Sequence, residues 1–559
     1  MEARTDHQQT SSGDPSPGRP RWVLLDSNMC WDDSDAMVCE DPDARAAPIT
    51  QRQQGSRRRD HPDAETVAEA LSSGGRHVRV SFDFAPPPAV SRLRVDSPGL
   101  PDGAQIRSQI IAAHGDSVLI EIDTRTPDLL DNYERDSSDY FVYNAGDAAA
   151  ADRSRPPSLS LLPPCHLTCR PLCRPQYEGK PRPKRLMPAE TTALLRRGDE
   201  DLLVAQLTLD GTEGEAPLEA ELCLLRSGAW EWELKRLTVL HGDGKRKEVS
   251  FWETDTVIPV GDRFLYWVDY YRGVIFLDAW EESPQLRYVS LPVEPQMERR
   301  PHHHASGSRY RGVCATDGGG AVSFVEVCPR CCCGSPGATF CSRSRYAFNI
   351  TTWTLRMDDD MATWDKVSMV DSDELWSLPG YGGVPRIRPE YPIVSLDDPD
   401  VLCFMVRKIG YHMEDVDGDH AIRMIEVDTK RMELRSVVCY DDNNNFCSPP
   451  EFIPGVISQY LDASSRNSRP PAKRHEQAPT TAAATIINEL NSSDNKAAMA
   501  SPGEMLATLR EIGDLASDDM LRTYSVLACD VSQFKFKLLL ALPKDMRKGY
   551  CLLLLENRL

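Results

Sequence analysis

Residues 254–293 read TDTVIPVGDRFLYWVDYYRGVIFLDAWEESPQLRYVSLPV. Apolar runs alternate with Gly-Asp, Arg-Gly and Ser-Pro turns, a pattern that predicts three or four short strands in succession. Glycine and proline punctuate such strands because they suit turn conformations. We therefore expect one small antiparallel sheet here.

Looser copies of this unit recur, each with apolar strands, a turn rich in Gly or Asp, and a strand that carries Trp or Tyr. The predicted units are 105–165, 198–241, 254–293, 309–370 and 391–440, and strands in 77–96 and 450–460 could complete a further unit that closes a ring. Units of about 40–50 residues with four strands are typical of propeller blades, and a ring buries sheet faces that one sheet cannot. The sequence therefore predicts a mainly β fold, an irregular β-propeller-like array of antiparallel four-stranded units. A large β-sandwich or two stacked sheets is the alternative.

Tryptophans recur at comparable places in these units, at Trp230, Trp232, Trp267, Trp353 and Trp364. Because Trp267 has such counterparts, we expect it to fill the layer between neighbouring blades rather than form a site. The turn Asp269–Arg272, with Tyr270 and Tyr271, is expected to expose its aromatic rings and to offer a contact surface.

Changes in composition divide the chain into four parts. The polar residues 1–20 are expected to be disordered, and 21–460 form the β domain, with loop insertions near 41–64 and 165–188. Residues 461–500 are a low-complexity linker. A capping box with proline at the first helical position, Ser501 to Glu504, begins a predicted α-helical module over 501–559.

Charge and hydropathy limit the possible partners. The chain has 64 Lys and Arg against 85 Asp and Glu, a formal charge of −21, and such a chain repels phosphate backbones. The basic segments 51–59 and 170–185 are interpreted as solvated loops. No apolar targeting segment opens the sequence, and the longest apolar runs, Leu538–Leu542 and Tyr550–Leu555, are too short to cross a membrane. We expect no nucleic-acid or membrane partner, and a location in the cytoplasm or nucleus.

The 17 cysteines are expected to be mostly free thiols in a reducing compartment. The densest group is a Cys-rich loop with Cys328, Cys331, Cys333 and Cys341, which follows the histidines 302–304. Cys328 and Cys331 have the spacing of a zinc knuckle, but Cys333 and Cys341 make a poor second pair. A second group, Cys165, Cys169 and Cys173, is spaced by three residues. We favour free thiols over zinc and assign no metal ligand.

Acidic runs provide no catalytic constellation. Asp415–His420 departs from the calcium-loop pattern, and Asp358–Asp360 and Asp397–Asp400 are interpreted as polar turns. His114, in a hairpin turn, is expected to be exposed and inert. Neither a nucleophile elbow nor a phosphate loop or dinucleotide fingerprint occurs. We therefore predict no catalytic residue and no cofactor.

Several phrases resemble a large plant family, expanded in grasses, known as domain of unknown function 1618. They are Trp22–Asp26, Asp139–Gly146 with Pro156–Pro164, Leu194–Arg197 with Leu202–Gln206, Trp267–Phe276 and Leu286–Pro292. The resemblance covers residues 20–460, and 501–555 is similar to the tail of many members. It implies a plant protein without an established biochemical role. The Trp-containing strands are also similar to the propeller-like domains that follow F-box motifs, but residues 1–60 lack the leucine pattern of an F-box.

Three functions are compatible with these features. The favoured hypothesis is a non-catalytic module that meets a protein partner through loops on one face of the ring. An enzyme with a pocket in the funnel of the propeller would instead require convergent polar groups with perturbed pKa values. A zinc-stabilised scaffold would require a complete ligand set at the cysteines.

Overall fold

The structure is a computed structural model of the 559-residue chain. It describes residues 19–27, 30–32, 63–100, 104–125, 138–146, 155–167, 184–209, 218–228, 231–242, 244–295, 309–316, 320–331, 346–358, 361–407, 422–440 and 451–461, with isolated positions between 508 and 548.

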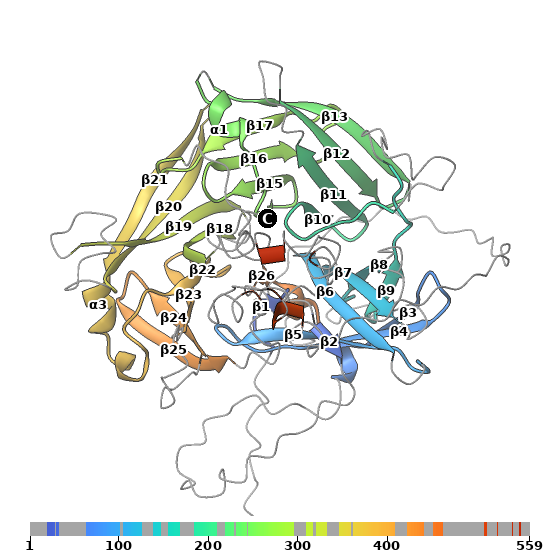
Figure 1. Ribbon diagram of the computed structural model, residues 1–559, viewed down its shortest axis with the longest axis horizontal. Coiled ribbons are helices and arrows are strands. Elements are labelled where there is room, and N and C mark those ends of the chain that lie inside the picture. The colour runs from blue at the N-terminus through green and yellow to red at the C-terminus, as the bar shows by residue number, and fades with distance from the viewer. Residues whose placement is uncertain are drawn as a thin grey trace, which may run out of the picture.

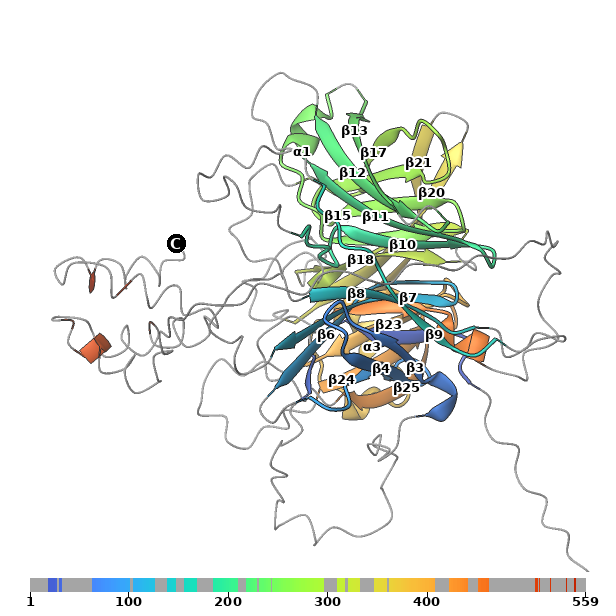
Figure 2. The ribbon, with the colours of Figure 1, turned by 90° about the vertical axis from the view of Figure 1, so that its right-hand side faces the viewer.

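The described strands form a ring of antiparallel units around a central axis (Figure 1), and Figure 2 shows this ring edge-on. They belong to five sheets of five, eight, four, five and four strands. The eight-stranded sheet consists of two units joined where β13 and β17 pair over two residues. The described residues therefore contain six units, which confirms the propeller-like fold and excludes the sandwich.

Units two to six follow the chain around the ring, and the four consecutive strands of each unit run from the axis outward, starting with β6, β10, β14, β18 or β22. Unit two has β6 (Gln105–His114), β7 (Ser117–Arg125), β8 (Ser138–Asn144) and β9 (Ser158–Leu161), with β2 (Cys30–Asp32) beside β6. Unit three has β10 (Thr192–Arg197), β11 (Asp201–Leu209), β12 (Glu219–Arg226) and β13 (Trp232–Leu240). Unit four has β14 (Thr256–Val260), β15 (Phe264–Asp269), β16 (Gly273–Asp278) and β17 (Leu286–Ser290). Unit five has β18 (Arg311–Thr316), β19 (Ala321–Pro329), β20 (Phe348–Asp358) and β21 (Met361–Asp371). Unit six has β22 (Glu390–Val394), β23 (Val401–Val406), β24 (Ile422–Asp428) and β25 (Glu433–Tyr440).

Unit one closes the ring from both ends of the β domain. Its order is β26 (Phe452–Gly455), β1 (Val23–Asp26), β5 (Val90–Asp96), β4 (His77–Asp83) and β3 (Ala68–Leu71). The last strand, β26, pairs antiparallel with β1 over four residue pairs. The predicted further unit from 77–96 and 450–460 is therefore present, and it also recruits residues 23–26.

Short helices lie between the strands. They are α1 (Arg246–Ser250), α3 (Ser372–Trp376), η3 (Ala64–Thr66), η8 (Tyr381–Gly383) and η9 (Ile457–Leu461). α3 begins at Asp371 with a capping box, because the Asp371 and Glu374 side chains satisfy backbone donors that its first turn leaves open.

One predicted unit boundary is wrong. The third unit begins at Thr192 rather than near 198, because Thr192–Arg197 forms the innermost strand and turns at Gly198 into β11. Gly198 has φ +57°, a conformation that L side chains rarely adopt. The polar turn at this glycine lies inside the unit rather than before it.

Tryptophans tie neighbouring units together. The indole of Trp267, whose side chain is fully buried, donates to the carbonyl of Thr191 in unit three at 3.0 Å. Trp232 donates to the Pro163 carbonyl of unit two, and Trp364 donates to the Ser290 carbonyl of unit four. The expected role of Trp267 between blades is therefore confirmed. Burying an indole is favourable only when its N–H finds an acceptor, and here the preceding unit supplies it.

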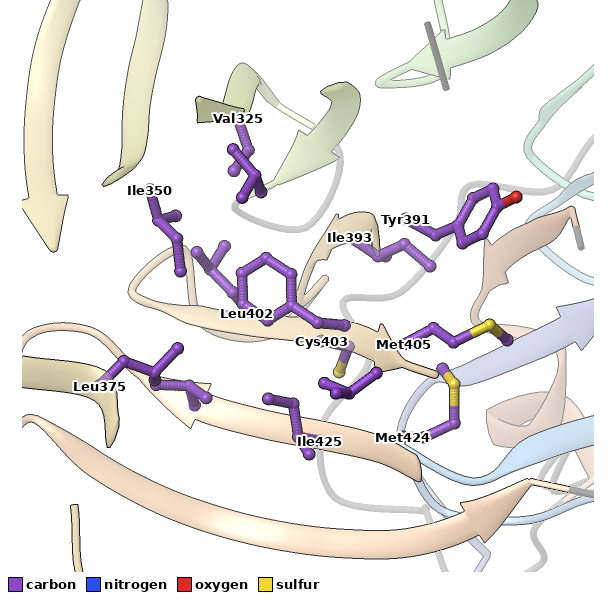
Figure 3. Packing of buried hydrophobic residues seen from close by; sticks show 14 of the residues in the cluster. Val325, Ile350, Leu375, Tyr391, Ile393, Leu402, Cys403, Met405, Met424 and Ile425 are labelled. Carbon is purple, nitrogen blue, oxygen red and sulfur yellow. The ribbon is translucent and has the colours of Figure 1, made fainter. Parts of the chain in front are cut away.

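Buried apolar side chains also fill the layer between units five and six. Figure 3 shows Val325 and Ile350 of unit five facing Leu402, Met405 and Ile425 of unit six. Gly312 of β18 lies so close to β22 that an added Cβ would meet the Pro392 carbonyl at 2.1 Å. The glycine therefore lets the innermost strands of the two units approach each other.

Several predicted segments lie outside the described residues. They are residues 1–18, most of the insertions near 41–64 and 165–188, and the linker 462–500. Of the predicted helical module, Thr508–Arg510 is described and has helical backbone. The predicted domain boundaries stay predictions.

Candidate functional site

The ring has two edges. We call the side at which the innermost strands β26, β6, β10, β14, β18 and β22 begin the start edge, and the side at which they end the end edge. Because neighbouring strands are antiparallel, the second strand of a unit ends at the start edge. Turns between second and third strands therefore share that edge with residues that precede the innermost strands.

A pair of opposite charges marks the start edge of unit five. Arg311, the first residue of β18, donates to Glu326 Oε1 from Nε at 2.9 Å and from Nη2 at 2.6 Å. Its Nη1 donates to the carbonyl of Tyr270, in the turn between β15 and β16, at 2.7 Å. The guanidinium carbon also lies 5.6 Å from the ring centroid of Tyr271. Each side-chain nitrogen of Arg311 thus donates a hydrogen bond, and the residue fixes the turn of unit four against unit five.

A second carboxylate, Glu390, begins β22 and is 5 % exposed. Arg407 Nε donates to its Oε2 at 2.8 Å, and Arg309 Nε lies 3.6 Å from its Oε1. A carboxylate buried to this degree needs such partners, since losing water is costly for a charge. Glu390 is thus satisfied.

Strained backbone follows Glu390. Tyr391 is buried and has φ +51°, and the β22–β23 register shifts between Glu390 and Ile393. Positive φ at a residue with a bulky side chain costs roughly 1–3 kcal/mol and persists only when packing enforces it. Packing around the buried Tyr391 therefore holds the start of β22 in this conformation, beside the charges just described.

Arg388 differs from its neighbours. Its guanidinium carbon stacks 3.1 Å from the ring centroid of Tyr310, and within the described part of the chain it forms no ion pair. A tyrosine face attracts a cation and leaves the N–H groups at the edge of the guanidinium open. Arg388 is thus positioned by an aromatic ring while its hydrogen-bond donors remain available.

Arg388 borders a hollow of about 190 Å³. Its lining is aromatic, apolar and charged, and comprises Tyr271, Tyr310, Arg311, Glu326, Val327, Cys328, Pro329 and Arg388. Burial and the nearby Glu326 carboxylate raise the pKa of Cys328, so its thiol stays protonated at neutral pH. We regard this hollow as the candidate site.

Sequence reasoning missed Tyr310, Arg311 and Arg388. A signal was available: an Arg-Tyr-Arg triplet at 309–311 and the segment Arg386–Tyr391 directly precede or begin two innermost strands. Such positions share one edge of a propeller whatever the distance between them in sequence.

The turn Asp269–Arg272 corrects an expectation. Tyr270 is buried rather than exposed, and Arg272 Nη1 donates to Asp269 Oδ2 at 2.7 Å in an ion pair that is itself buried. The ion pair draws the turn inward, and Tyr270 packs among apolar residues of units four and five. Burial raises the pKa of Tyr270. Tyr271 alone keeps the expected role, because it lines the hollow.

Carboxylates gather near the axis on the start edge. Glu190, Asp255 and Glu451 precede β10, β14 and β26. Burial, together with the negative charges of Glu190 and Asp255, raises the pKa of Glu451 to about 7. In the described residues no group of three His, Cys, Asp or Glu has the geometry to hold a metal ion.

His114 also departs from expectation, because it is partly buried rather than exposed and free. Its Nδ1 accepts the backbone N–H of Arg196 at 2.9 Å, which links units two and three at the end edge. Burial lowers the pKa of His114 to about 4. The imidazole of His114 is therefore neutral at pH 7, and its Nδ1 serves as a hydrogen-bond acceptor.

The cysteine groups are described only in part. Cys328 and Cys331 belong to the described residues, whereas Cys333, Cys341 and the histidines 302–304 lie outside them, as do Cys169 and Cys173. Cys165 Sγ lies 3.5 Å from Cys223 Sγ, a neighbour that the spacing of residues 165–173 does not indicate.

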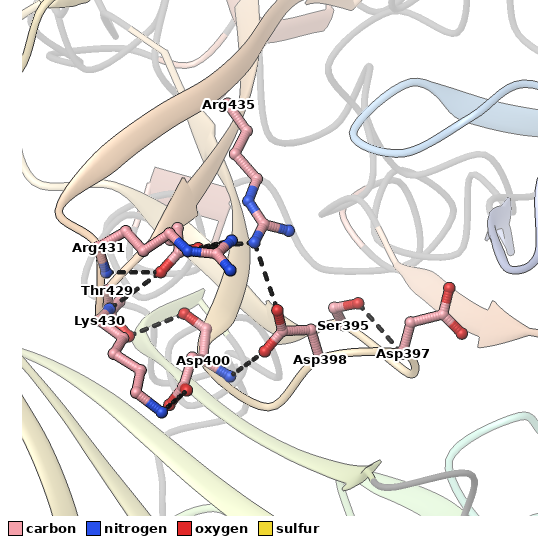
Figure 4. A network of polar contacts seen from close by, with 9 residues as sticks. Ser395, Asp397, Asp398, Asp400, Thr429, Lys430, Arg431 and Arg435 are labelled. Atoms are coloured by element: carbon pink, nitrogen blue, oxygen red, sulfur yellow. Dashed lines mark hydrogen bonds and ion pairs between the residues drawn. The ribbon is translucent and has the colours of Figure 1, made fainter.

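The acidic turn Asp397–Asp400 forms a polar network at the end edge of unit six (Figure 4). Asp398 and Asp428 both bind Arg435, at 3.3 and 2.6 Å, and Asp400 lies 3.2 Å from Lys430. Its carboxylates close turns, in agreement with the predicted polar turn. Residues 415–420 lie outside the described residues.

The ring of antiparallel units defines a protein of the β-propeller-like class. Residues 267–403, about a quarter of the chain, match the model of the family "Protein of unknown function (DUF1618)". The match contains every residue that lines the hollow. No curated protein matches the sequence.

Solved structures give distant likenesses. The WD40 domain of SCAP from fission yeast is 11 % identical, with 66 % of this chain and 73 % of that chain covered and a TM-score of 0.26. A hypothetical selenium-binding protein from Sulfolobus tokodaii is 12 % identical, with 72 % and 77 % covered and a TM-score of 0.27. A β-fructofuranosidase from Bombyx mori is 10 % identical, with 60 % and 62 % covered and a TM-score of 0.23. Scores this low carry no argument about function. Among the described residues, none of the helices has the length and apolar character to span a membrane.

Proposed function

We propose that this protein is a non-catalytic interaction module that binds a protein partner through the start edge of units four to six. The observation that carries the proposal is the charge of the cluster of arginines and carboxylates beside the hollow. Four arginines, Arg309, Arg311, Arg388 and Arg407, accompany two carboxylates, Glu326 and Glu390. This excess of two positive charges lies in a chain of net charge −21.

A local charge opposite to the net charge is suited to recognition. Charges on a rim steer a partner and select its orientation. Arginine and tyrosine are also the side chains most often enriched where partners bind. Tyr271, Tyr310 and Arg388 supply both at one hollow.

Affinity capture tests this proposal. The purified full chain, immobilised, is exposed to cell extract beside a Tyr271→Ala, Tyr310→Ala double variant and an Arg356→Ala control. Arg356 is exposed and lies near the end of β20, toward the end edge, and its side chain does not line the hollow. We expect one reproducible partner that the wild type and the control retain and the double variant loses. Equal capture by all three chains, or no reproducible partner, would overturn the proposal.

A second candidate function is an enzyme that uses the centre of the ring, and Glu451 favours it. A carboxyl group whose pKa lies at about 7 can act as a general acid or base at neutral pH. The test is to incubate the wild type and Glu451→Gln with a cell metabolite extract and follow its components by mass spectrometry. A compound consumed by the wild type alone would support the enzyme, and unchanged extracts would remove it.

A further inference from the structure

We propose that the hollow beside Arg388 binds the side-chain carboxylate of an aspartate or glutamate in a peptide segment of the partner. This inference rests on the proposed function and adds the chemistry that the site recognises.

The first support is the position of the Arg388 guanidinium. Tyr310 covers one face of it at 3.1 Å, so the group is held without using its hydrogen-bond donors. A planar guanidinium offers two parallel N–H groups that match the two oxygens of a carboxylate. Because the ring already orients this group, less conformational freedom is lost when a carboxylate binds.

The second support is the occupancy of the neighbouring charges. Glu326 holds Arg311, and Glu390 holds Arg309 and Arg407, with distances between 2.6 and 3.6 Å. Both carboxylates of the cluster are therefore engaged. Of the four arginines in this cluster, Arg388 has no carboxylate partner among the described residues, and an incoming acid would complete the pattern that the other three arginines follow.

The third support is the size and lining of the hollow. About 190 Å³ is below the roughly 300–1,000 Å³ of small-molecule sites, and it suits one side chain. Val327 and Pro329 give apolar walls for methylene groups, and Tyr271 closes another side. A glutamate or aspartate fits this combination of a short apolar stem and a charged end.

Peptide selection provides the test. A displayed library of random twelve-residue peptides is selected on the purified full chain, and the strongest peptide is synthesised with its acid, with the matching amide, and with phosphoserine at that position. Calorimetry then measures each affinity. We expect enrichment of Asp or Glu at one position, and about tenfold weaker binding of the amide peptide, the usual effect of losing a charged hydrogen bond.

Matched variants locate the contact. Arg388→Ala should bind the acidic peptide about as weakly as the wild type binds the amide peptide. The affinity of Arg388→Lys should be intermediate, because lysine keeps the positive charge but lacks the two parallel N–H donors of the guanidinium. Arg386→Ala, an exposed arginine two residues away, should bind like the wild type. Melting temperatures of all three variants should stay near that of the wild type.

Several results would overturn the inference. They are selection without acidic enrichment, Arg388→Ala binding as well as the wild type, and preference for the phosphoserine peptide over the carboxylate. If affinity capture returns a partner that Arg388→Ala retains, the proposed function survives and the carboxylate assignment falls. If affinity capture with the wild type returns no reproducible partner, the proposed function and the carboxylate assignment are both overturned.

Discussion

Unit six carries clusters of arginine and carboxylate at both of its edges, and they differ in charge matching. At the end edge, Arg435 forms ion pairs with Asp398 and Asp428, and Lys430 forms one with Asp400. At the start edge, Arg407 forms an ion pair with Glu390, but Arg388 stacks on the ring of Tyr310 and borders the hollow. The first cluster closes turns, whereas the second leaves one arginine ready for a charge from outside.

The difference shows how a structural network can be told from a recognition site in the same fold. In a structural network, carboxylates have cation or backbone partners because burial penalises an unpaired charge. A binding site, by contrast, contains a side chain that is already oriented and whose hydrogen-bond donors have no acceptor within the protein. A substitution in the network of the end edge should therefore lower the stability of the protein. A substitution of Arg388 at the start edge should instead weaken binding of the partner and leave stability nearly unchanged.

The largest expected effect is at the end edge, with Asp428→Ala. Asp428 is 2 % exposed and accepts the backbone N–H of Lys430 at 3.1 Å and of Arg431 at 2.8 Å, besides Arg435. Losing these bonds should lower the free energy of unfolding by about 3 kcal/mol, as measured by urea unfolding at pH 7. Asp397→Ala, an exposed neighbour, should change it by less than about 0.5 kcal/mol. Equal effects of the two variants would show that the network is not structural.

The pH dependence of this effect has a definite sign. Burial alone would raise the pKa of Asp428, but the Arg431 N–H and the Arg435 guanidinium outweigh it, so the pKa lies below its usual value. The stabilisation is therefore present above the unfolded pKa of about 4 and is lost as the pH falls through the folded pKa. The difference in the free energy of unfolding between the wild type and Asp428→Asn should therefore become smaller as the pH falls below about 4.

The next effect belongs to the start edge and has the opposite direction. The folded pKa of Glu451, about 7, lies above its ordinary value of 4.5. Folding therefore favours the protonated form, and stability falls as the pH rises from about 4.5 to 7. Glu451→Gln should stabilise the protein by about 2 kcal/mol at pH 8 and by little at pH 4.5. Urea unfolding at both pH values measures this. A variant that is less stable at pH 8 would contradict the burial of an unpaired charge.

His114 should give an effect of similar size at the end edge. Its folded pKa of about 4 lies below the ordinary 6.5, so the unfolded chain binds more protons between these values and stability falls as the pH drops through that window. His114→Asn, which keeps an acceptor for the Arg196 N–H, should reduce this loss by about 2 kcal/mol between pH 6.5 and 4. Thermal unfolding across that range is the measurement, and an unchanged slope would mean that His114 titrates normally.

The smallest effect on stability is expected from Arg388→Ala. This side chain forms no ion pair among the described residues, so the free energy of unfolding should change by less than about 0.5 kcal/mol. Arg311→Ala should cost about 2 kcal/mol, because it leaves Glu326 and the Tyr270 carbonyl without their donors. Urea unfolding of both variants compares them. A large loss for Arg388→Ala would make it a structural arginine like Arg435.

Much of the fold was predictable because strand patterns are local. The strands predicted in 77–96 are present as β4 and β5, and the recurrence of tryptophan in other units indicated the place of Trp267 between blades. The start of unit three was misplaced because Thr192–Arg197 is a short apolar run beside a glycine turn. The exposure of Tyr270 and His114 was misjudged because turn residues are usually solvated, and neither the buried Asp269–Arg272 pair nor the Arg196 N–H is visible in a pattern.

The sequence by itself determined the strands of residues 254–293 and the repetition of that unit, because side-chain alternation and turn residues act over a few positions. It also determined the net negative charge. Only the tertiary structure decided that Arg388 stacks on Tyr310, that Glu326 and Glu390 occupy the other arginines, and that a hollow remains between them. These residues come from different strands and two units, and ring closure alone brings them to one edge.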